Sequence, residues 1–205
     1  MSKSYDAGSS LSQKIIAGVD KLADNVASTL GPRGRNVIIK QAGKRPIITK
    51  DGVTVAEFVD LDDPFEDVGA QIIKQASRQT NSVAGDGTTT ATVLARAILH
   101  GAQRHIVAGA SPIDVKRQID ATVEEYVQNL KDMARPIQSE EDIAHIATIS
   151  ANNDETIGKL VAKAVDCVGK DGSISVEEAR SLETSLDLTE GFRFDSGYTA
   201  TAFIN

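Results

Sequence analysis

The hydrophobic positions of this 205-residue chain recur mostly every three or four residues, a spacing that predicts a largely helical protein. The first such run extends from Leu11 to Leu30. It stops at Gly31-Pro32, because proline cannot continue a helix and glycine accepts the dihedral angles of a helix end. Three longer helices are expected further on: from Phe65 to about Val83, from Thr88 to about Val107, and from Ser111-Pro112 to Arg135-Pro136.

A few short segments have a strand-like pattern instead. The β-branched runs 36–40 and 47–50 are separated by the turn-forming segment QAGKRP and predict a hairpin. Asp51-Gly52 then turns the chain into a short helix, Val53–Val59. Further strands are expected at Gly172–Glu177 and Ser185–Thr189, and the final segment, 192–205, is expected to be extended. The fold class is therefore mainly α with small β elements (α+β).

The character of the chain changes after Arg135-Pro136, where we expect a domain boundary. Ser139 precedes three acidic residues, which predicts a capped helix that continues to about Ile149. Another helix is expected to begin at Asn153-Asp154-Glu155 and to end at Gly169. With a second break at Glu190-Gly191, the expected domains are 1–136, 137–190 and the start of a third at 191–205.

Composition and charge exclude several classes of protein. Hydrophobic residues make up 40% of the chain, enough for a core, but five Phe, three Tyr and no Trp leave that core to aliphatic side chains. The net charge of −7 argues against nucleic-acid binding, which requires a basic face. No apolar run approaches the roughly 20 residues that span a bilayer, and the first residues lack the apolar region of a secretory signal. We therefore expect a soluble chain of the cytoplasm or another reducing compartment, without a membrane partner.

The cysteine and histidine residues do not suggest a metal or nucleophile centre. Cys167, the single cysteine, cannot form an internal disulfide and lies in an apolar stripe, so we expect it to be buried. His100, His105 and His145 are far apart and no HExxH motif is present, which argues against zinc. No GxSxG motif supports serine-type catalysis.

The segment AGDGTTTAT, from Ala84 to Thr92, is the best candidate for a ligand site. Its two glycines let the backbone approach a ligand, and a helix that starts at Thr88 offers unpaired N–H groups to phosphate. Asp86 could hold Mg²⁺ together with phosphate oxygens. A glycine-rich turn with a threonine N-cap and no ligand explains the same residues. The segment is not a Walker A motif, because the chain contains no GxxxxGK[ST].

Two other segments are weaker candidates. TLGPRGRN, from Thr29 to Asn36, is a helix end followed by a loop with two arginines. Taken alone, it is explained better by a C-cap loop with solvated charges than by a ligand site. In the segment 49–52, Lys50 could meet a phosphate and Asp51 could orient water or polarise a metal shell. The alternative there is a turn with an exposed ion pair.

The ordered set TLGPRGRN, ITKDG, AGDGTTTAT, TISANNDE and EGFRFDSGY closely resembles the N-terminal part of the group I chaperonins, the Hsp60 or GroEL type, from about residue 11 to residue 205. The resemblance implies that residues 1–136 are the first part of the ATP-binding equatorial domain. It implies that residues 137–190 are the ascending half of the intermediate domain, and that residues 191–205 begin the apical domain.

The resemblance also implies roles for individual residues. The nucleotide-binding positions would be Thr29, Leu30, Gly31, Pro32, Lys50, Asp86, Gly87, Thr88, Thr89 and Thr90. Asp86 would be the magnesium ligand and Asp51 a catalytic carboxylate that assists hydrolysis. Potassium would lie near Thr29, Lys50 and Thr89, and Ile149 and Asn152 would close on the nucleotide.

The chain departs from the family pattern in three places. Its first ten residues match poorly, in a segment that the family uses to pair with a neighbouring subunit. Tyr198 and Phe203 keep aromatic residues of the apical binding face, but Ala200 and Ala202 stand where Ser and Tyr are usual. The sequence also stops before the rest of the apical domain, the descending half of the intermediate domain with the principal catalytic Asp, and the C-terminal half of the equatorial domain.

The resemblance implies an ATP-dependent chaperonin subunit that assists the folding of non-native polypeptides. Its cofactors would be ATP and Mg²⁺, with K⁺ as a further ion. Its partners would be unfolded clients, a co-chaperonin of the GroES type and other subunits of a ring. The alternative is a non-enzymatic half-chaperonin that binds chaperonin subunits or clients without ATP turnover. A kinase-like phosphotransferase is disfavoured, because the sequence contains no acceptor-site motif.

Overall fold

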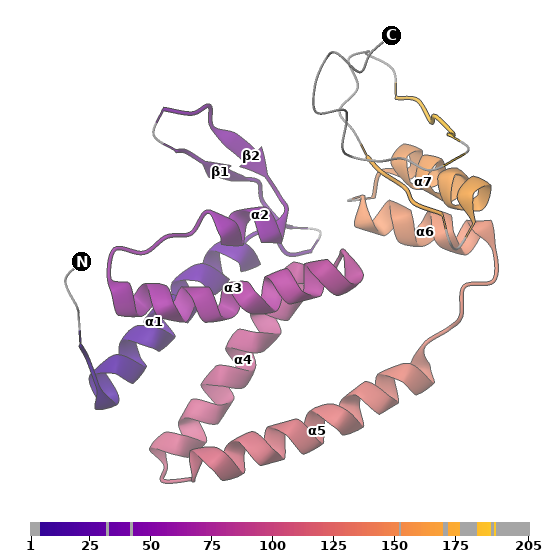
Figure 1. Cartoon of the computed structure of the whole chain (residues 1–205). Helices are drawn as coiled ribbons and strands as arrows, with labels where there is room; N and C mark the ends of the chain where they lie inside the picture. The colour runs from indigo at the N-terminus through magenta and orange to yellow at the C-terminus, as the bar shows by residue number, and fades with distance from the viewer. Residues whose placement is uncertain are drawn as a thin grey trace, which may run out of the picture. The chain divides into compact units, whose positions relative to one another are not determined.

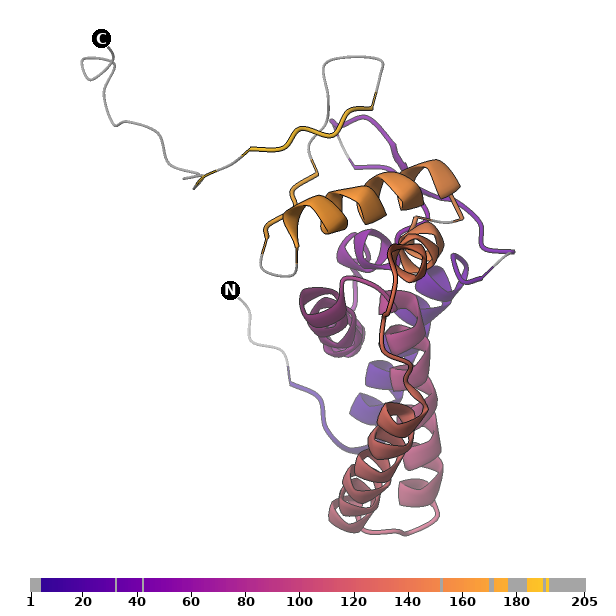
Figure 2. The ribbon, with the colours of Figure 1, turned by 90° about the vertical axis from the view of Figure 1, so that its right-hand side faces the viewer.

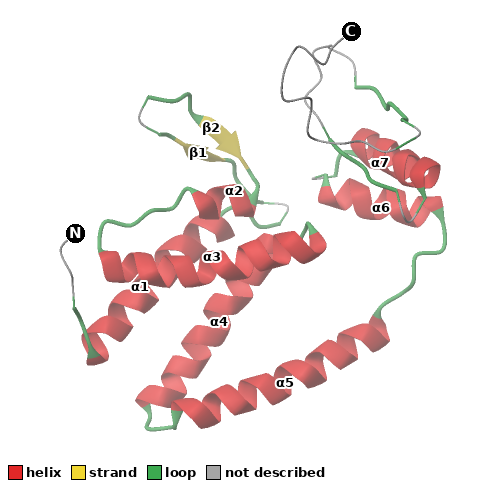
Figure 3. Cartoon of the chain, viewed as in Figure 1, coloured by secondary structure: helices red, strands yellow, loops and turns green. Residues whose placement is uncertain are grey.

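The computed structural model describes residues 5–31, 33–41, 43–151, 153–169, 172–176, 184–189 and 191. In these ranges the chain is mainly helical, with one small hairpin (Figures 1 and 3). The elements are α1 (Gly8–Ala27), β1 (Val37–Ile39), β2 (Ile47–Thr49), α2 (Gly52–Glu57), α3 (Pro64–Ala84), α4 (Thr88–Val107), α5 (Pro112–Met133), α6 (Glu140–Ser150) and α7 (Glu155–Val168). No helix within these ranges is long and apolar enough to cross a membrane.

The chain divides into two compact units between Met133 and Ala134, three residues before the expected boundary after Pro136. Helices α1–α5 and the hairpin belong to the first unit, and α6 and α7 to the second. The assignment of these units to equatorial and intermediate domains stays a prediction.

The core of the first unit forms where α1, α2 and α3 meet. Val19, Leu22 and Val26 of α1 are fully buried against residues of α2 and α3, namely Val55, Ala56, Ala70 and Ile73. Two glycines let α1 and α3 approach closely. A Cβ at Gly18 would lie 1.8 Å from the Glu66 carbonyl oxygen, and one at Gly69 would lie 2.0 Å from that of Ile15. The two backbones are therefore in direct contact.

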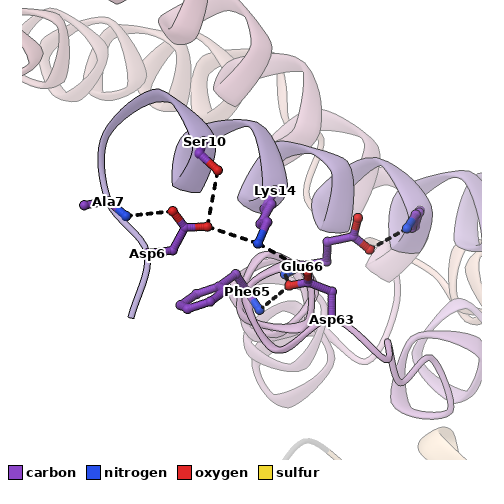
Figure 4. Close-up of polar contacts among 8 residues, drawn as sticks. Asp6, Ala7, Ser10, Lys14, Asp63, Phe65 and Glu66 are labelled. Atoms are coloured by element: carbon purple, nitrogen blue, oxygen red, sulfur yellow. Dashed lines mark hydrogen bonds and ion pairs between the residues drawn. The ribbon is translucent and has the colours of Figure 1, made fainter. Parts of the chain in front are cut away.

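An ion cluster joins the starts of α1 and α3 (Figure 4). The Lys14 ammonium lies 3.0 Å from the Asp6 carboxylate and 3.4 Å from that of Asp63, and 5.0 Å from the centroid of the Phe65 ring. Asp63 is the N-cap of α3 and accepts hydrogen bonds from the amides of Phe65 and Glu66. Lys14 thus connects Asp63, the N-cap of α3, to Asp6, which lies two residues before the start of α1.

Helix α5 packs against little of the rest of its unit. It diverges from α4 beyond their short connection in Figure 1, although the two overlap in the view of Figure 2. None of its 22 residues is buried. Its apolar side chains remain exposed at Ile113, Val123, Tyr126, Val127, Leu130 and Met133.

The second unit contains two packed helices whose ends agree with the sequence prediction. Helix α6 opens with a capping box, in which the Ser139 hydroxyl accepts from the Asp142 amide at 3.2 Å and the Asp142 carboxylate accepts from the Ser139 amide at 3.1 Å. Asp154 caps α7, which ends at Val168 with Gly169 as its C-cap. Gly158 lets α7 lie directly against Thr148 of α6, since a Cβ there would meet the Thr148 hydroxyl at 2.0 Å.

Three sequence predictions about local structure need correction. Residues 172–176 and 184–189 are irregular rather than stranded. A strand persists only where its backbone groups pair with a neighbour, and Val176 is instead 93% exposed. Cys167 is exposed, because α7 buries only Gly158, Ala162 and Ala164, a narrower strip than its apolar pattern indicates. Helix α1 begins and ends three residues earlier than predicted. The expected extended segment 192–205 lies outside the described residues.

Candidate functional site

Three segments of the first unit that are far apart in sequence meet at the start of α4. The Thr29 hydroxyl, just after α1, lies 3.4 Å from the hydroxyl of Thr89 in the first turn of α4. Gly52, the first residue of α2, lies so close that a Cβ on it would be 2.2 Å from the Thr89 hydroxyl and 3.3 Å from that of Thr88. The structure therefore brings parts of all three candidate segments together.

The backbone before α4 has a conformation that only glycine adopts easily. Gly85 and Gly87 have φ of 70° and 80°, in the left-handed region. Gly87 is the N-cap of α4 and has no side chain with which to cap the helix, so the prediction of a threonine N-cap is wrong. The first amides of a helix lack intrahelical acceptors, so an external anion is a suitable acceptor for those of α4. The Asp86 carboxylate accepts from the Gly87 amide at 2.6 Å.

Thr88 and Thr92 anchor the start of α4 in the interior. Both are buried, and the Thr92 hydroxyl donates to the Thr88 carbonyl oxygen at 2.9 Å. Thr89 is half-buried and Thr90 is exposed. The three consecutive hydroxyls predicted to bind phosphate therefore sit in different environments, and Thr89 is the one beside Thr29 and Gly52.

Asp51 has a structural role that the sequence analysis missed. It is the N-cap of α2, where its carboxylate accepts from the Thr54 amide at 2.9 Å, the Thr54 hydroxyl at 2.6 Å and the Val53 amide at 3.4 Å. An aspartate followed by a short helix is a common N-cap pattern, which was the available sequence evidence. Lys50 is exposed and forms no ion pair with Asp51, so the alternative of a simple ion pair in a turn is wrong.

The turn after α1 is held by its own hydrogen bonds. The buried Thr29 hydroxyl donates to the Val26 carbonyl oxygen at 2.7 Å, and the Arg35 amide donates to that of Ser28 at 2.9 Å. Gly31 has a φ of 72°, which suits glycine, and Leu30 is exposed. Pro32 lies outside the described residues.

The chemistry of these groups suits a nucleotide phosphate. Amides at the start of α4, threonine hydroxyls and the Lys50 ammonium are donors for phosphate oxygens. Asp51 and Asp86 supply carboxylates. In the described ranges no three His, Cys, Asp or Glu side chains gather closely enough to hold a metal by themselves, so a magnesium ion here would need phosphate oxygens to complete its coordination.

Two other groups of predicted residues form no part of the contacts described above. His100 is paired with Asp20, with 2.7 Å between Nε2 and Oδ1. Ile149 is an exposed residue of α6 in the second unit, and Asn152 lies outside the described residues. Neither takes part in the geometry described above.

The mainly helical fold is of the chaperonin equatorial type. Residues 22–203 match the sequence model of the TCP-1/cpn60 chaperonin family, and the chain belongs to this family. The prediction of the fold class is thereby confirmed, as is the resemblance to chaperonins.

Two solved chaperonins are similar to this chain. A group III chaperonin in the open state is 26% identical, with a TM-score of 0.64, over 77% of this chain and 31% of that one. The chaperonin gp146 from the bacteriophage EL 2 (Pseudomonas aeruginosa), crystallised in the presence of ATP-BeFx, is 30% identical, with a TM-score of 0.64, over 77% of this chain and 28% of that one. The chain spans less than a third of the length of these chaperonins.

Proposed function

We propose that this chain is the N-terminal portion of an ATP-dependent chaperonin subunit that assists the folding of non-native polypeptides. The observation that carries the proposal is the convergence of Thr29, Gly52 and Thr89 at the start of α4, where Gly87 is the N-cap. Membership of the chaperonin family supports it, and so does the fact that gp146 was crystallised with an ATP analogue.

In this proposal each group of the site has a separate task. The α4 amides, the hydroxyls of Thr89 and Thr90, and Lys50 bind the phosphates of ATP. Asp86 holds Mg²⁺, which when bound neutralises charge on the phosphates. Asp51 orients the attacking water, and Thr29 and Thr89 contribute oxygens to a neighbouring K⁺. Leu30, Gly31 and Pro32 line the nucleotide, and Gly87 and Thr88 shape the loop.

The order of the five motifs favours the group I, Hsp60 or GroEL type within the family. That assignment brings with it a homo-oligomeric ring, a co-chaperonin of the GroES type and unfolded polypeptide clients as partners. Separately, the single cysteine favours the cytoplasm or another reducing compartment. Co-purification of ring-sized assemblies, measured by native mass spectrometry, tests the oligomer directly.

Binding of Mg–ATP to the chain tests the site. Asp86→Ala should remove the Mg²⁺-dependent part of ATP binding, because the substitution deletes the proposed metal ligand. Isothermal titration calorimetry with and without Mg²⁺ measures it. Asp62→Ala is the matched control, since Asp62 is an exposed aspartate in the connection between α2 and α3. Equal Mg–ATP affinity in Asp86→Ala and Asp62→Ala would refute the pocket.

The structure also favours a second candidate, a half-chaperonin that binds other subunits or clients without turnover. The exposed apolar residues of α5 carry it, because such a face is suited to docking another polypeptide. Phosphate release separates the two candidates. Release above background that is lost in Asp51→Asn supports the ATPase, whereas none in the unaltered chain supports the binding protein.

A further inference from the structure

Two cations on α3 converge on the last residue of α2. The Lys74 ammonium donates to the Glu57 carbonyl oxygen at 3.4 Å and also lies 3.4 Å from the Asp60 carboxylate. One turn further along α3, the Arg78 guanidinium donates to both carboxylate oxygens of Glu57, with 2.5 Å between Nη2 and Oε2. We call Lys74 and Arg78 with Glu57 the α3 clamp. It holds the main chain and the side chain of one residue at once.

Burying the Lys74 ammonium costs desolvation free energy, so its position in the core calls for an explanation. The residue is only 2% exposed, on the same face of α3 as the core residues Ala70 and Ile73. An ammonium loses its hydration there, and its two acceptors are distant. A well-packed apolar side chain is often as stabilising at such a position. The buried hydroxyl of Ser77, one turn further on, has no hydrogen-bond partner in the described part of the chain. We call Lys74 and Ser77 the polar strip of α3. Stability alone does not account for the burial of these two polar side chains.

The strip contacts the helix that carries part of the candidate site. Helix α2 has six residues, with Asp51 as its N-cap and Gly52 against the hydroxyls of Thr88 and Thr89. The last carbonyl groups of a helix lack intrahelical donors, and Lys74 supplies one to Glu57. Because α2 is only about 9 Å long, a displacement of Glu57 is transmitted to Gly52.

We propose that Lys74 and Arg78 are positioning residues, which act through Glu57 to set α2, and with it Asp51 and Gly52, against Thr89 of α4. Their importance for nucleotide chemistry rests on the proposed function of that site. Their effect on α2 is a claim about geometry that is tested without nucleotide.

The experiment compares local hydrogen exchange with global stability in the full chain. Lys74→Met removes the ammonium but keeps the length of the side chain. The Val53 and Thr54 amides, which Asp51 caps, should exchange about tenfold faster in this variant. The thermal midpoint should stay the same or rise, because a buried charge has been removed. Arg78→Met should behave similarly at these amides, and Arg78→Lys should restore part of their protection.

Lys21→Met is the matched control, because Lys21 pairs with Glu66 and links α3 to α1 rather than to α2. It should leave the Val53 and Thr54 amides unchanged. Unchanged exchange at these two amides in Lys74→Met overturns the proposal. So does a uniform rise over α1, α3 and α2 with a lower midpoint, which would indicate a merely structural role.

Calorimetry with Mg–ATP, followed by NMR of the nucleotide-bound chain, then separates the proposal on the clamp from the proposed function. If the unaltered chain binds no nucleotide, the proposed function fails while the exchange result still decides on the clamp. If it binds, Lys74→Met should change the amide chemical shifts of Thr88 and Thr89 in the bound state, whereas Lys21→Met should not. Identical shifts in the two variants overturn the link between the clamp and the site.

Discussion

At the scale of single residues, Asp51 combines a structural contact with a proposed catalytic task. Its carboxylate caps α2, and the same group is the one proposed to orient water. Loss of activity in an alanine variant is therefore ambiguous. Asparagine resolves the ambiguity, because it caps helices as well as aspartate does but is a far weaker base.

We expect Asp51→Ala to lower the free energy of unfolding of the first unit by about 1 kcal/mol, the usual worth of an N-cap. Asp51→Asn should lower it by only a few tenths of that amount while abolishing any phosphate release. Urea denaturation followed by circular dichroism measures the first quantity. Equal stability of the alanine and asparagine variants would show that the cap contributes nothing.

Individual residues were predicted unevenly from the sequence. The segments that carry Thr29, Lys50 and Asp86 were recognised because motif spacing is visible in the chain, and their roles stay predictions. The cap by Asp51, the buried Lys74 and the exposed Cys167 were not predicted. Each depends on what a neighbouring element covers or donates, and periodicity within one helix contains no information about that.

At the scale of elements, the contact between α1 and α3 depends on the absence of side chains. Gly18 and Gly69 lie against opposing carbonyl groups, which belong to backbone that cannot rotate away. Helix propensity alone would favour alanine at both positions. The glycines therefore reflect the packing of two helices and not a break in either one.

Gly69→Ala should destabilise the first unit by about 1–3 kcal/mol, the range for overpacking a close contact. Gly101→Ala is the control, because Gly101 is also within a helix but a Cβ there meets nothing within 4 Å. That change should stabilise α4 by about 0.5–1 kcal/mol. Thermal unfolding of both variants gives the comparison, and a destabilised Gly101→Ala would contradict it.

The bounds of helices and strands were predicted well where the local sequence includes a helix-terminating glycine, an N-cap residue or a turn. The bounds of α4, α6 and α7 follow from glycine, serine and aspartate at their ends, and the hairpin follows from its turn. The two expected strands after Gly169 were wrong over their described residues, because a strand requires a paired neighbour that local pattern does not reveal.

At the scale of the whole molecule, carboxylates with lowered pKa values are spread over both units. Hydrogen bonding to Lys14 lowers the pKa of Asp6, the Phe65 amide lowers that of Asp63, and Arg78 lowers that of Glu57. In the second unit the Gln138 amide and the Ser139 side chain lower the pKa of Asp142. Each group stabilises the fold while ionised.

Because these pKa values are lower in the folded state, their stabilisation is present above the unfolded values, near 3.8 for Asp and 4.5 for Glu, and is lost as the pH falls through the folded values. We expect both units to lose stability in acid. Asp63→Asn should reduce the loss of stability at low pH in the first unit only. Asp142→Asn should reduce that loss in the second unit only. The urea concentration at the unfolding midpoint, measured between pH 2 and 7, tests this. The same pH dependence of the midpoint in all variants would contradict the roles given to Asp63 and Asp142.

The long-range packing of α1 has a consequence for the synthesis of the protein. Helix α1 ends at Ala27, but α3, which covers its apolar face, is complete only at Ala84, 57 residues later. At translation rates of about 5–20 residues per second, that interval lasts roughly 3–11 seconds. During this time Val19, Leu22 and Val26 on a nascent chain have no native partner from α3. A nascent chain therefore exposes these three apolar side chains of α1 for several seconds before α3 can cover them.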